Sequence, residues 1–577
     1  MLIRLIRTYL RRYRRLLILL VFLQFVQAMG TLFLPTLNAD IINQGVLTGD
    51  TDYIWRVGAL MLVITLVQVA FAVSAVYCGS RAAMSFGRDV RGDLFHTVTS
   101  YSAREVGEFG APSLITRITN DVQQVQMLVL MGCTLLVASP ITIIGGTILA
   151  VNEDGPLSLI LLVAIPILLF SVGVVAFRMH PAFTLMQERI DRVNQILREQ
   201  ISGIRVVRAF VREPDETERF SGANSELTAT ALRTGRMMAF MFPTVMLTVN
   251  LASAAAVWLG ANRIGSGEMQ VGSLVAFLSY LIQILMAVMM GTFVLSMAPR
   301  AAVCAARIHD VLTTKSSVLT AENPVMELPS PASLELRHAG FSFPGAEKAV
   351  LTDISFKVSA GQTLAIIGST GSGKSALLSL VVRLFDTTNG QVLVNGVDVR
   401  DIDPDALHGA VGYVPQKPYL FSGTVASNVR FGDPDADDDA VWHALEIAQA
   451  RDFVAAMPGG IHARIAQGGS NVSGGQRQRL AIARAIAHQP DIYLFDDSFS
   501  ALDLATDARL RAALVPVVAD AVNVIVAQRV STILEADQIL VLEEGREVGL
   551  GTHRELLDTC PTYVEIVESQ FVAEEVA

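Results

Sequence analysis

Six long apolar segments constrain the fold of this chain more than any other feature of its sequence. A helix that crosses a lipid bilayer needs about 20 consecutive, mostly apolar residues. Segments of that kind occupy Leu16–Leu34, Ile54–Tyr77, Val125–Ala150, Leu157–Phe177, Ala239–Leu259 and Val271–Met297. The composition agrees, because 52% of the 577 residues are hydrophobic and only 17% are charged. We therefore expect a polytopic α-helical membrane domain with six transmembrane helices.

The links between these segments predict their orientation. Links after the first, third and fifth segments are short and acidic, whereas those after the second and fourth are long and rich in arginine. Positively charged links stay in the cytoplasm, so we expect a multi-pass protein of the cell (cytoplasmic or inner) membrane with both termini cytoplasmic. Ile190, Val193 and Ile196 recur at helical spacing, which predicts that the helices extend well into the cytoplasm before they turn back.

The first 15 residues contain six arginines and no acidic residue. A secretory signal peptide would have a shorter apolar run and a small-residue cleavage site soon after it. Residues 1–15 fit better as a basic helix at the membrane interface, in contact with membrane lipid. The whole chain carries a formal charge of −10, which disfavours nucleic acid as a partner.

After the sixth segment the chain becomes more polar and changes its pattern. We expect a transmembrane domain over residues 16–313, a proline-containing linker over 314–331, an α/β domain over 332–570 and a C-terminal tail over 571–577. The α/β assignment rests on the alternation of short apolar strands with helices. The four cysteines lack metal-like spacing and are predicted to be small buried hydrophobic residues: Cys78, Cys133, Cys304 and Cys560.

One run in the α/β domain matches the phosphate-binding loop G-x-x-x-x-G-K-S. It comprises Gly368, Ser369, Thr370, Gly371, Ser372, Gly373, Lys374 and Ser375. Glycines let backbone N–H groups point at phosphate oxygens, Lys374 supplies a compact positive charge, and Ser375 offers a hydroxyl to Mg²⁺. An apolar strand precedes the run and an apolar helix follows it. The sequence therefore predicts a P-loop nucleotide-binding domain that takes ATP and Mg²⁺.

Other candidate site residues follow predicted strands or open a helix. Gln416 follows a strand and could contact Mg²⁺ and the attacking water, while Asp496 ends an apolar strand and would hold Mg²⁺ through water. Phe343 either stacks on adenine or is a core residue. A second anion site is predicted where a helix opens with Val472, Ser473, Gly474, Gly475 and Gln476.

Together these motifs resemble those of an ATP-binding cassette (ABC) exporter half-transporter, in which six membrane spans are fused to one nucleotide-binding domain. The signature Val472–Gln476 differs from the usual Leu-Ser-Gly-Gly-Gln in one residue, and Ser500–Asp503 matches the D-loop. Residues 109–110, 117–121 and 199–210 resemble the intracellular-loop motifs of that family. The resemblance covers essentially the whole chain.

The resemblance implies a dimer. Two nucleotide-binding domains would close head to tail around two ATP molecules. Each site would combine the phosphate loop of one chain with the signature and D-loop Asp503 of the other. Short coupling helices at the ends of the long cytoplasmic helices would dock on the nucleotide domains. Closure would then switch the membrane cavity from inward-facing to outward-facing.

Two catalytic positions depart from the family pattern. Asp497 stands where the family has a Glu that polarises the attacking water, and Gln528 stands where it has the switch His. Catalysis is sensitive to the position of a shorter carboxylate, and Gln carries no titratable proton. We hypothesise that the chain is the degenerate-site half of a heterodimer, hydrolysing ATP weakly at its own site, whose partner carries Glu and His. A homodimer of modest activity is the alternative.

The substrate is less constrained than the fold. Methionines concentrated in the fifth and sixth segments favour a hydrophobic or amphipathic compound such as a drug or lipid, or else they merely pack the helices. Polar residues at membrane depth either line a cavity or bridge helices: Gln24, Gln27, Gln68, Asn250 and Gln283. We expect export. The same fold could import or flip lipid, and a non-transporting ATP-binding regulatory subunit is the alternative of another class.

Overall fold

The computed structural model describes residues 1–576, with the side chains of all except Ala176, His180 and residues 571–576. The chain forms two compact units. The first comprises Met1–Thr99 and Pro112–Thr314, and the second comprises Ser100–Ala111 and the chain from Lys315 onward. Each unit has its own hydrophobic core.

The first unit is entirely helical. Its helices are α1 (Leu2–Leu10), α2 (Arg14–Asp40), α3 (Thr51–Thr99), α5 (Ala111–Thr116), α6 (Val122–Met131), α7 (Ala138–Glu153), α8 (Leu159–Ala209), α9 (Glu213–Gly265) and α10 (Val271–Thr313). Short 3₁₀ and π segments connect several of them: η1 (Arg11–Tyr13), η2 (Ile41–Val46), η3 (Arg117–Asp121) and η4 (Gly132–Leu136). Through these segments some neighbouring helices run on as single longer rods.

Six helical rods are long and apolar enough to cross a membrane among the residues that the structure describes, which confirms the six predicted spans. They are 43 to 53 residues long. At about 1.5 Å per residue this is roughly 65–80 Å, whereas the hydrocarbon core of a bilayer is about 30 Å thick. Each rod therefore continues well beyond the membrane, as the sequence predicts.

Helix α10 forms the centre of the packing in this unit. Its side chains Phe277, Tyr280 and Ile284 are fully buried. The Tyr280 hydroxyl donates to the carbonyl of Leu32, at 3.0 Å, and lies 2.6 Å from the Thr36 hydroxyl. A polar group at membrane depth is thus satisfied by the neighbouring helix α2.

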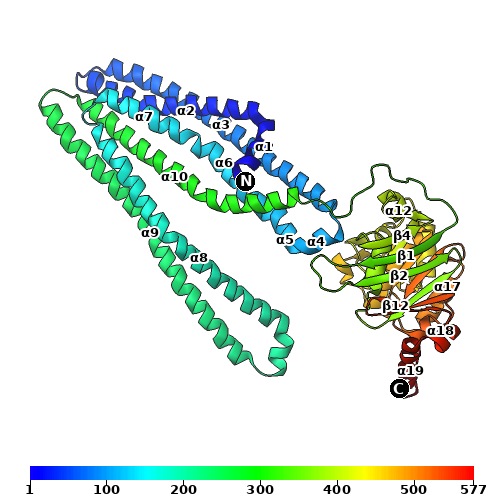
Figure 1. Cartoon of the computed structure of the whole chain (residues 1–577). Coiled ribbons are helices and arrows are strands. Elements are labelled where there is room, and N and C mark those ends of the chain that lie inside the picture. Colours follow the sequence, from blue (N-terminus) through cyan, green and yellow to red (C-terminus); the bar gives the residue numbers. More distant parts are fainter. Residues whose placement is uncertain (577) are drawn as a thin grey trace. The chain divides into compact units, whose positions relative to one another are not determined.

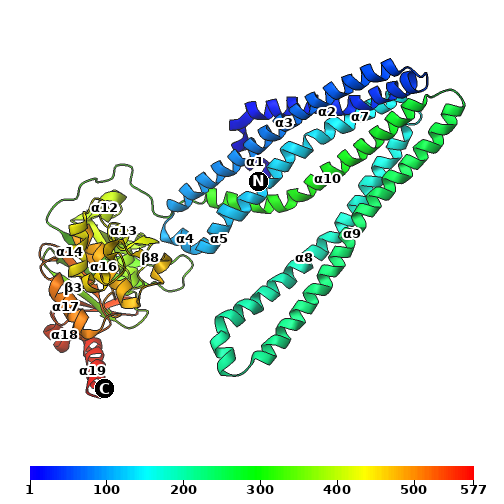
Figure 2. The same cartoon turned by 180° about the vertical axis from the view of Figure 1, so that it is seen from behind.

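Helices α8 and α9 form an antiparallel hairpin. Figures 1 and 2 show that the two helices run side by side and separate from the other long helices along much of their length. The hairpin leaves large apolar side chains uncovered, including Phe177, Ile201 and Phe210, which are 83%, 73% and 73% exposed. Exposed apolar surface of this extent indicates contact with lipid or with another protein.

The second unit contains a ten-stranded sheet. Its order is β5-β4-β1-β2-β12-β11-β3-β10-β9-β6 among the described residues, and β7 and β8 form a separate pair. The strands are β1 (Ser333–Phe341), β2 (Leu351–Ser359), β3 (Thr363–Gly368), β4 (Asn389–Val394), β5 (Val397–Asp398), β6 (Val411–Val414), β7 (Gly423–Thr424), β8 (Arg464–Ile465), β9 (Ile492–Asp496), β10 (Val522–Val526), β11 (Gln538–Glu543) and β12 (Arg546–Gly551). Strands β11, β3, β10, β9 and β6 are parallel to one another.

Helices cover both faces of the parallel strands. The helices of this unit after β3 are α11 (Lys374–Val381), α12 (Pro404–Ala410), α13 (Val425–Val429), α14 (Asp438–Ile447), α15 (Arg451–Ala455), α16 (Gly474–His488), α17 (Leu504–Leu514), α18 (His553–Thr559) and α19 (Pro561–Val576), with 3₁₀ turns η5 (Gly460–His462), η6 (Gln467–Gly469) and η7 (Val530–Thr532). Strand β3 shows why both faces are apolar. Leu364 and Ile366 belong to one hydrophobic core, and Ala365 and Ile367 belong to the other.

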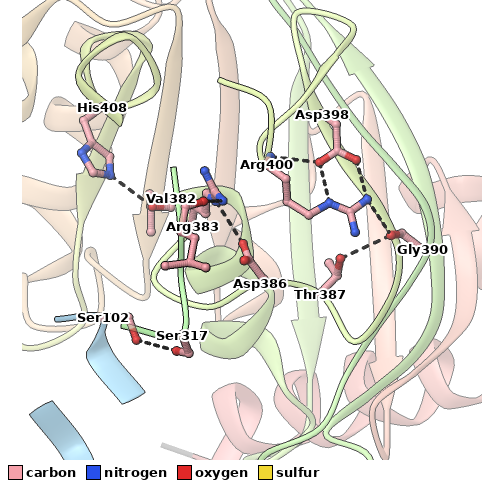
Figure 3. Close-up of polar contacts among 11 residues, drawn as sticks. Ser102, Ser317, Val382, Arg383, Asp386, Thr387, Gly390, Asp398, Arg400 and His408 are labelled. Carbon is pink, nitrogen blue, oxygen red and sulfur yellow. Dashed lines mark hydrogen bonds and ion pairs between the residues drawn. The ribbon is translucent and has the colours of Figure 1, made fainter. Parts of the chain in front are cut away.

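A short helix from the membrane half of the sequence belongs to this second unit. Helix α4 (Ala103–Phe109) begins with a capping box in which Ser102 and Glu105 satisfy backbone N–H groups. The hydroxyls of Ser102 and Ser317 lie 2.9 Å apart, so α4 is held against the segment that leads into the sheet (Figure 3). Arg383 anchors the same segment by donating to the carbonyl of Leu319, at 2.7 Å.

The two ends of the second unit differ in their regularity. Between α10 and β1 the chain has no named helix or strand in the part that the structure describes, where the sequence predicts a linker over 314–331. At the C-terminus α19 continues to Val576, through most of the predicted tail of residues 571–577. Ala and Glu in this stretch favour helix. Ala577 lies outside the described residues.

Candidate active site

The predicted phosphate-binding loop lies where four neighbouring parallel strands end. The loop follows β3, Gln528 follows β10, Asp496 ends β9, and Gln416 follows β6. Ligands of α/β sheets bind at this carboxyl edge. A cavity of about 270 Å³ is lined by Thr370, Gly371, Gly373, Lys374, Ser375, Ala376, Gln416, Asp496, Asp497, Val526 and Gln528. The structure thus brings together predicted residues that are up to about 160 positions apart in the sequence.

Glycine is required at the start of helix α11. Gly373 has φ +95°, which only glycine adopts readily. A Cβ atom there would lie 2.7 Å from a methyl carbon of Leu351 and 3.0 Å from the carbonyl oxygen of Val350. The loop backbone is therefore free to turn its N–H groups toward the cavity, and the N-terminus of α11 adds its partial positive charge.

Lys374 is held by the loop itself. Its ammonium donates to the carbonyl oxygens of Gly368 and Ser369, at 2.8 and 2.7 Å, and to the hydroxyl of Ser372, at 3.3 Å. Burial lowers the pKa of Lys374, and the carboxylates of Asp497 and Asp496 oppose this shift. The ammonium is preorganised beside the cavity, where phosphate oxygens would replace the carbonyls as its partners.

Asp496 and Ser375 form an oxygen-rich pair at the cavity wall. The Ser375 hydroxyl donates to Oδ1 of Asp496, at 3.1 Å, and the Tyr413 hydroxyl lies 3.4 Å from Oδ2. Burial raises the pKa of Asp496, although the bonds from Ser375 and Tyr413 oppose this shift. A hydroxyl and a carboxylate this close are hard oxygen donors, so these residues fit Mg²⁺.

Asp497 accepts two amide hydrogen bonds on one oxygen. Gln416 Nε2 and Gln528 Nε2 both donate to Oδ2, at 2.9 and 2.7 Å. The residue is buried, and its φ of +48° lies in the left-handed region that Asp and Asn tolerate better than most residues. Its backbone N–H donates to the carbonyl of Val526, at 3.0 Å, which fixes the turn after β9.

The predicted signature lies apart from this cavity. Ser473 is the N-cap of α16 and forms a capping box with Gln476: its hydroxyl accepts from the Gln476 N–H, at 3.2 Å. Ser473 and Gly474 are exposed. Asp503 caps α17 by accepting from the Thr506 N–H, at 2.9 Å, and that bond lowers its pKa. Within the described part of the chain, the signature Val472–Gln476 and Asp503 do not line the cavity around Lys374.

Phe343 retains much of its exposure. It is 45% exposed, while its neighbour Phe341 is buried. The Phe343 ring makes edge-on contacts with Phe341 and Phe385, at centroid distances of 4.9 and 5.6 Å. One side of the ring is thus supported by other aromatic rings, and the remaining surface is available to a ligand.

Sequence reasoning missed two residues that contact the predicted site. Tyr413 stands three positions before Gln416, but nothing in the local pattern indicates that its hydroxyl reaches Asp496. Gln570 lies on the C-terminal helix, 42 residues after Gln528. Its side chain bonds the backbone on both sides of Arg529. Neither belongs to a recognisable motif, and only the folded structure shows the contacts.

In the membrane half, one polar side chain has a structural role. Gln24 is buried, and its Nε2 donates to the carbonyls of Cys133 and Thr134, at 2.6 and 3.1 Å. Of the two alternatives for this residue, it bridges helices. Cys133 is itself buried and free, as are the other three cysteines among the described residues.

Comparison with known protein families gives two matches. Residues 17–288 match the ABC transporter transmembrane region, and residues 351–500 match the ABC transporter family. The first match spans the long helices, and the second begins at β2 and includes the phosphate-binding loop and Asp497.

Individual relatives agree with these matches. The chain is 49% identical over 574 residues to an uncharacterized ABC transporter ATP-binding protein of Mycobacterium tuberculosis, covering 99% of this chain and 98% of the relative. It is 33% identical to a multidrug efflux ATP-binding/permease protein of Mycobacterium bovis, covering 85% of this chain and 41% of that protein. A solved bacterial Atm1-family ABC exporter with ATP bound has the same fold, with a TM-score of 0.79 at 24% identity over 97% of this chain and 98% of that one.

Proposed function

Because this chain belongs to the ABC transporter family, as a transmembrane region fused to a nucleotide-binding domain, we propose that it is the slowly hydrolysing half of a heterodimeric exporter. It is a multi-pass membrane protein with an ATP-binding domain of a family that hydrolyses ATP. The finer proposal concerns its partner, its substrate and the rate of its own site.

The roles of the site residues follow from their contacts. Lys374 would bind the β- and γ-phosphates, and Ser375 and Asp496 would hold Mg²⁺, which supplies charge neutralisation when it is bound. Phe343 offers an exposed ring face to adenine. Asp497 is the residue that would accept a proton from the attacking water or orient it.

The arrangement around Asp497 is the observation that carries the slow-site proposal. Two amides donate to one carboxylate oxygen of Asp497, at 2.7 and 2.9 Å. An oxygen that already accepts two hydrogen bonds has little capacity left to accept one from a water. Asp is also one methylene shorter than the usual Glu, and a displacement of about 1 Å in a catalytic group can cost on the order of 10²-fold in rate. Gln528 can donate to a phosphate but cannot carry a proton to it.

Two exposed surfaces support a second subunit. Ser473 and Gly474 present a hydroxyl and helix N–H groups to solvent, away from the cavity around Lys374. They are suited to complete the site of a partner. The α8–α9 hairpin leaves Phe177, Ile201 and Phe210 uncovered, which is unfavourable for a monomer unless lipid or a partner covers them. A partner with Glu and His at the matching catalytic positions would supply the competent site.

The proposed substrate is a hydrophobic or amphipathic compound, such as a drug or lipid. A relative that is 33% identical is named a multidrug efflux protein, although this chain spans only 41% of its length. The long helices are apolar, with a mean hydropathy between 1.6 and 2.9 over their most apolar windows. Such surroundings favour an apolar ligand over an ion. The arginine-rich long links support a cytoplasmic location for the nucleotide-binding domain and both termini.

The decisive experiment is the Mg-ATPase activity of the detergent-purified chain, alone and together with the subunit that co-purifies from its native membrane. We expect brisk hydrolysis only in the pair. Rapid hydrolysis by a stable dimer of this chain alone would refute the heterodimer proposal. Binding of ATP without any effect of substrate on the turnover of the pair would favour a regulatory subunit instead.

A further inference from the structure

Gln570, on the C-terminal helix, holds the backbone of the loop that carries Gln528. Its Nε2 donates to the carbonyl oxygen of Gln528, at 2.8 Å, and its Oε1 accepts from the N–H of Val530, also at 2.8 Å. One side chain thus pairs with both sides of Arg529, in the way a neighbouring strand would. It satisfies two backbone groups that immediately follow strand β10.

The helix that supplies Gln570 is itself firmly placed. Tyr563 is fully buried, and its hydroxyl lies 2.7 Å from Nδ1 of His553 on α18. Thr562 donates to Glu543 at the end of β11, at 3.0 Å. Val567, one helical turn before Gln570, is buried in the core that also includes Val530. The position of α19 is therefore coupled through Gln570 to the loop after β10.

The side chain of Gln528 depends on this backbone. Its Nε2 is 2.7 Å from Oδ2 of Asp497, and the residue lines the cavity beside Lys374. A rotation of the 528–530 backbone would displace that amide, because the side chain moves with the backbone that carries it. The two bonds from Gln570 oppose such a rotation.

We propose that Gln570 is a positioning residue for the nucleotide site: by bonding the Gln528 carbonyl and the Val530 N–H, it aims the Gln528 amide at the place of the γ-phosphate. This inference rests on the proposed binding of ATP at Lys374. It makes the C-terminal helix a part of the site, although α19 contributes no side chain to the cavity among the described residues. Displacement of α19 would then weaken recognition of ATP without touching any residue that contacts the nucleotide.

The test compares two nucleotides in the purified full-length chain. Affinities for the non-hydrolysable analogue adenylyl imidodiphosphate and for ADP are measured by competition with a fluorescent nucleotide. Gln570→Ala should weaken binding of the analogue about three- to tenfold and leave ADP binding unchanged, because it misplaces the Gln528 amide and costs only part of what complete loss of a hydrogen bond to a charged group would cost. Equal weakening of both nucleotides, or no weakening of either, would overturn the proposal.

A double-substitution cycle separates positioning from general damage. In a Gln528→Ala background the side chain that Gln570 positions is gone, so adding Gln570→Ala should have little further effect. If the two substitutions act independently, Gln570 does not work through Gln528, and the inference fails. Glu568→Ala, an exposed change on the same helix, is the matched control and should leave both affinities unchanged.

The proposed slow hydrolysis can fail separately. The comparison of adenylyl imidodiphosphate with ADP reports on the γ-phosphate contact and not on turnover. A chain that hydrolyses ATP rapidly would refute the degenerate-site proposal while the difference between the two nucleotides still tests Gln570.

Discussion

At the scale of single residues, Asp497 and Gln528 are the two positions of the site that depart from the family pattern, and their effects depend on each other. Gln528 stands where the resembled family pattern has a titratable His, and its amide donates to Oδ2 of Asp497. The Gln416 amide donates to the same oxygen. Neither position can be judged alone, because the Gln528 amide occupies part of the hydrogen-bonding capacity of the Asp497 carboxylate.

We predict that restoring both positions increases turnover more than the sum of the single changes. Asp497→Glu with Gln528→His should raise single-turnover ATP cleavage by about ten- to a hundredfold. Asp497→Glu alone should give less, because the Gln528 amide stays on the carboxylate, and because φ +48° suits Glu less well than Asp. Rapid-quench measurement of ATP cleavage tests this in the pair, with the partner's own phosphate loop disabled so that only this chain's site contributes. Asp497→Asn, which cannot act as a base, is the control, and a double variant no faster than the native chain would contradict the slow-site proposal.

The pKa of Lys374 gives a second prediction at this scale. Burial lowers that pKa below the ordinary value for lysine, about 10.4. The ammonium is therefore lost at a lower pH than usual, and affinity for ATP should fall as the pH rises through this lowered pKa. Equilibrium binding of a fluorescent ATP analogue at increasing alkaline pH measures the effect. In Lys374→Arg, whose charge persists, the residual binding should not show this decline, and an equally steep decline there would assign it to another group.

Much of the site was predictable from sequence, because the phosphate loop is a contiguous motif and the other residues come at or directly after the ends of predicted strands. The phosphate loop, Gln416, Asp496, Asp497 and Gln528 line one cavity, as their position after parallel strands predicts. Tyr413 and Gln570 were not predictable. Their contacts depend on side-chain reach and on how distant helices pack, and neither leaves a periodic or motif-like trace in the sequence.

At the scale of elements, Arg383 ties the segment after α10 to the end of α11. Its side chain is 6% exposed and donates to Asp386, at 3.0 Å (Figure 3). It also donates to the carbonyl of Leu319, at 2.7 Å. Both groups lose their partner if the guanidinium is removed. Because α11 begins at the phosphate loop, this contact connects the nucleotide site with the chain that arrives from the membrane helices.

We predict that Arg383→Met lowers the free energy of unfolding of the second unit by about 1–2 kcal/mol, since it removes a buried guanidinium together with its bonds to Asp386 and to the Leu319 carbonyl. Urea titration followed by Trp442 fluorescence measures this, with Trp55 and Trp258 replaced by Phe so that they do not contribute. Arg337→Met is the matched control. Its guanidinium is 57% exposed and pairs with Glu335, so its loss should cost less than about 1 kcal/mol. Equal losses of the free energy of unfolding in the two variants would show that the Arg383 contacts stabilise the unit no more than an exposed ion pair does.

The elements differ in how well the sequence predicts them. Long apolar runs predict the six membrane rods, and strand–loop–helix chemistry predicts β3 and α11, because both depend on local patterns. The family resemblance predicts short coupling helices that dock on the nucleotide domains, but no local pattern in the sequence assigned α4 to the second unit. That placement depends on a few polar contacts, such as the one between Ser102 and Ser317, over a separation of 215 residues. The π segments also escape prediction, since no local pattern in residues 41–46, 117–121 and 132–136 distinguishes them from α-helix.

At the scale of the whole molecule, the proposed heterodimer predicts an asymmetric response to mutation. Gly474→Asp places a negative charge on the exposed signature, where a Cβ atom meets nothing within 4 Å among the described residues, so the chain itself is not strained. In the pair it would repel the γ-phosphate held by the partner, and like charges in such contact cost several kcal/mol. Turnover should fall at least about tenfold.

The companion substitution is Lys374→Met, which disables phosphate binding in this chain's own cavity. It should leave most of the turnover of the pair, because the partner's loop still binds ATP. The steady-state Mg-ATPase activity is measured for each variant chain in complex with the native partner, and the two values are compared. If Lys374→Met stops turnover as completely as Gly474→Asp does, the two sites are equivalent, and the division of labour is wrong.

The two amides on Asp497 have a consequence for timing. In the proposed pair, ATP at this site outlasts many cleavage events at the other site, because its own cleavage is slow. The two nucleotide-binding domains then remain joined through the retained nucleotide while the competent site reloads. The retained nucleotide would keep the two domains associated between transport cycles, so the pair would not have to reassemble in each one. The rate at which this nucleotide is exchanged would not depend on the rate of transport.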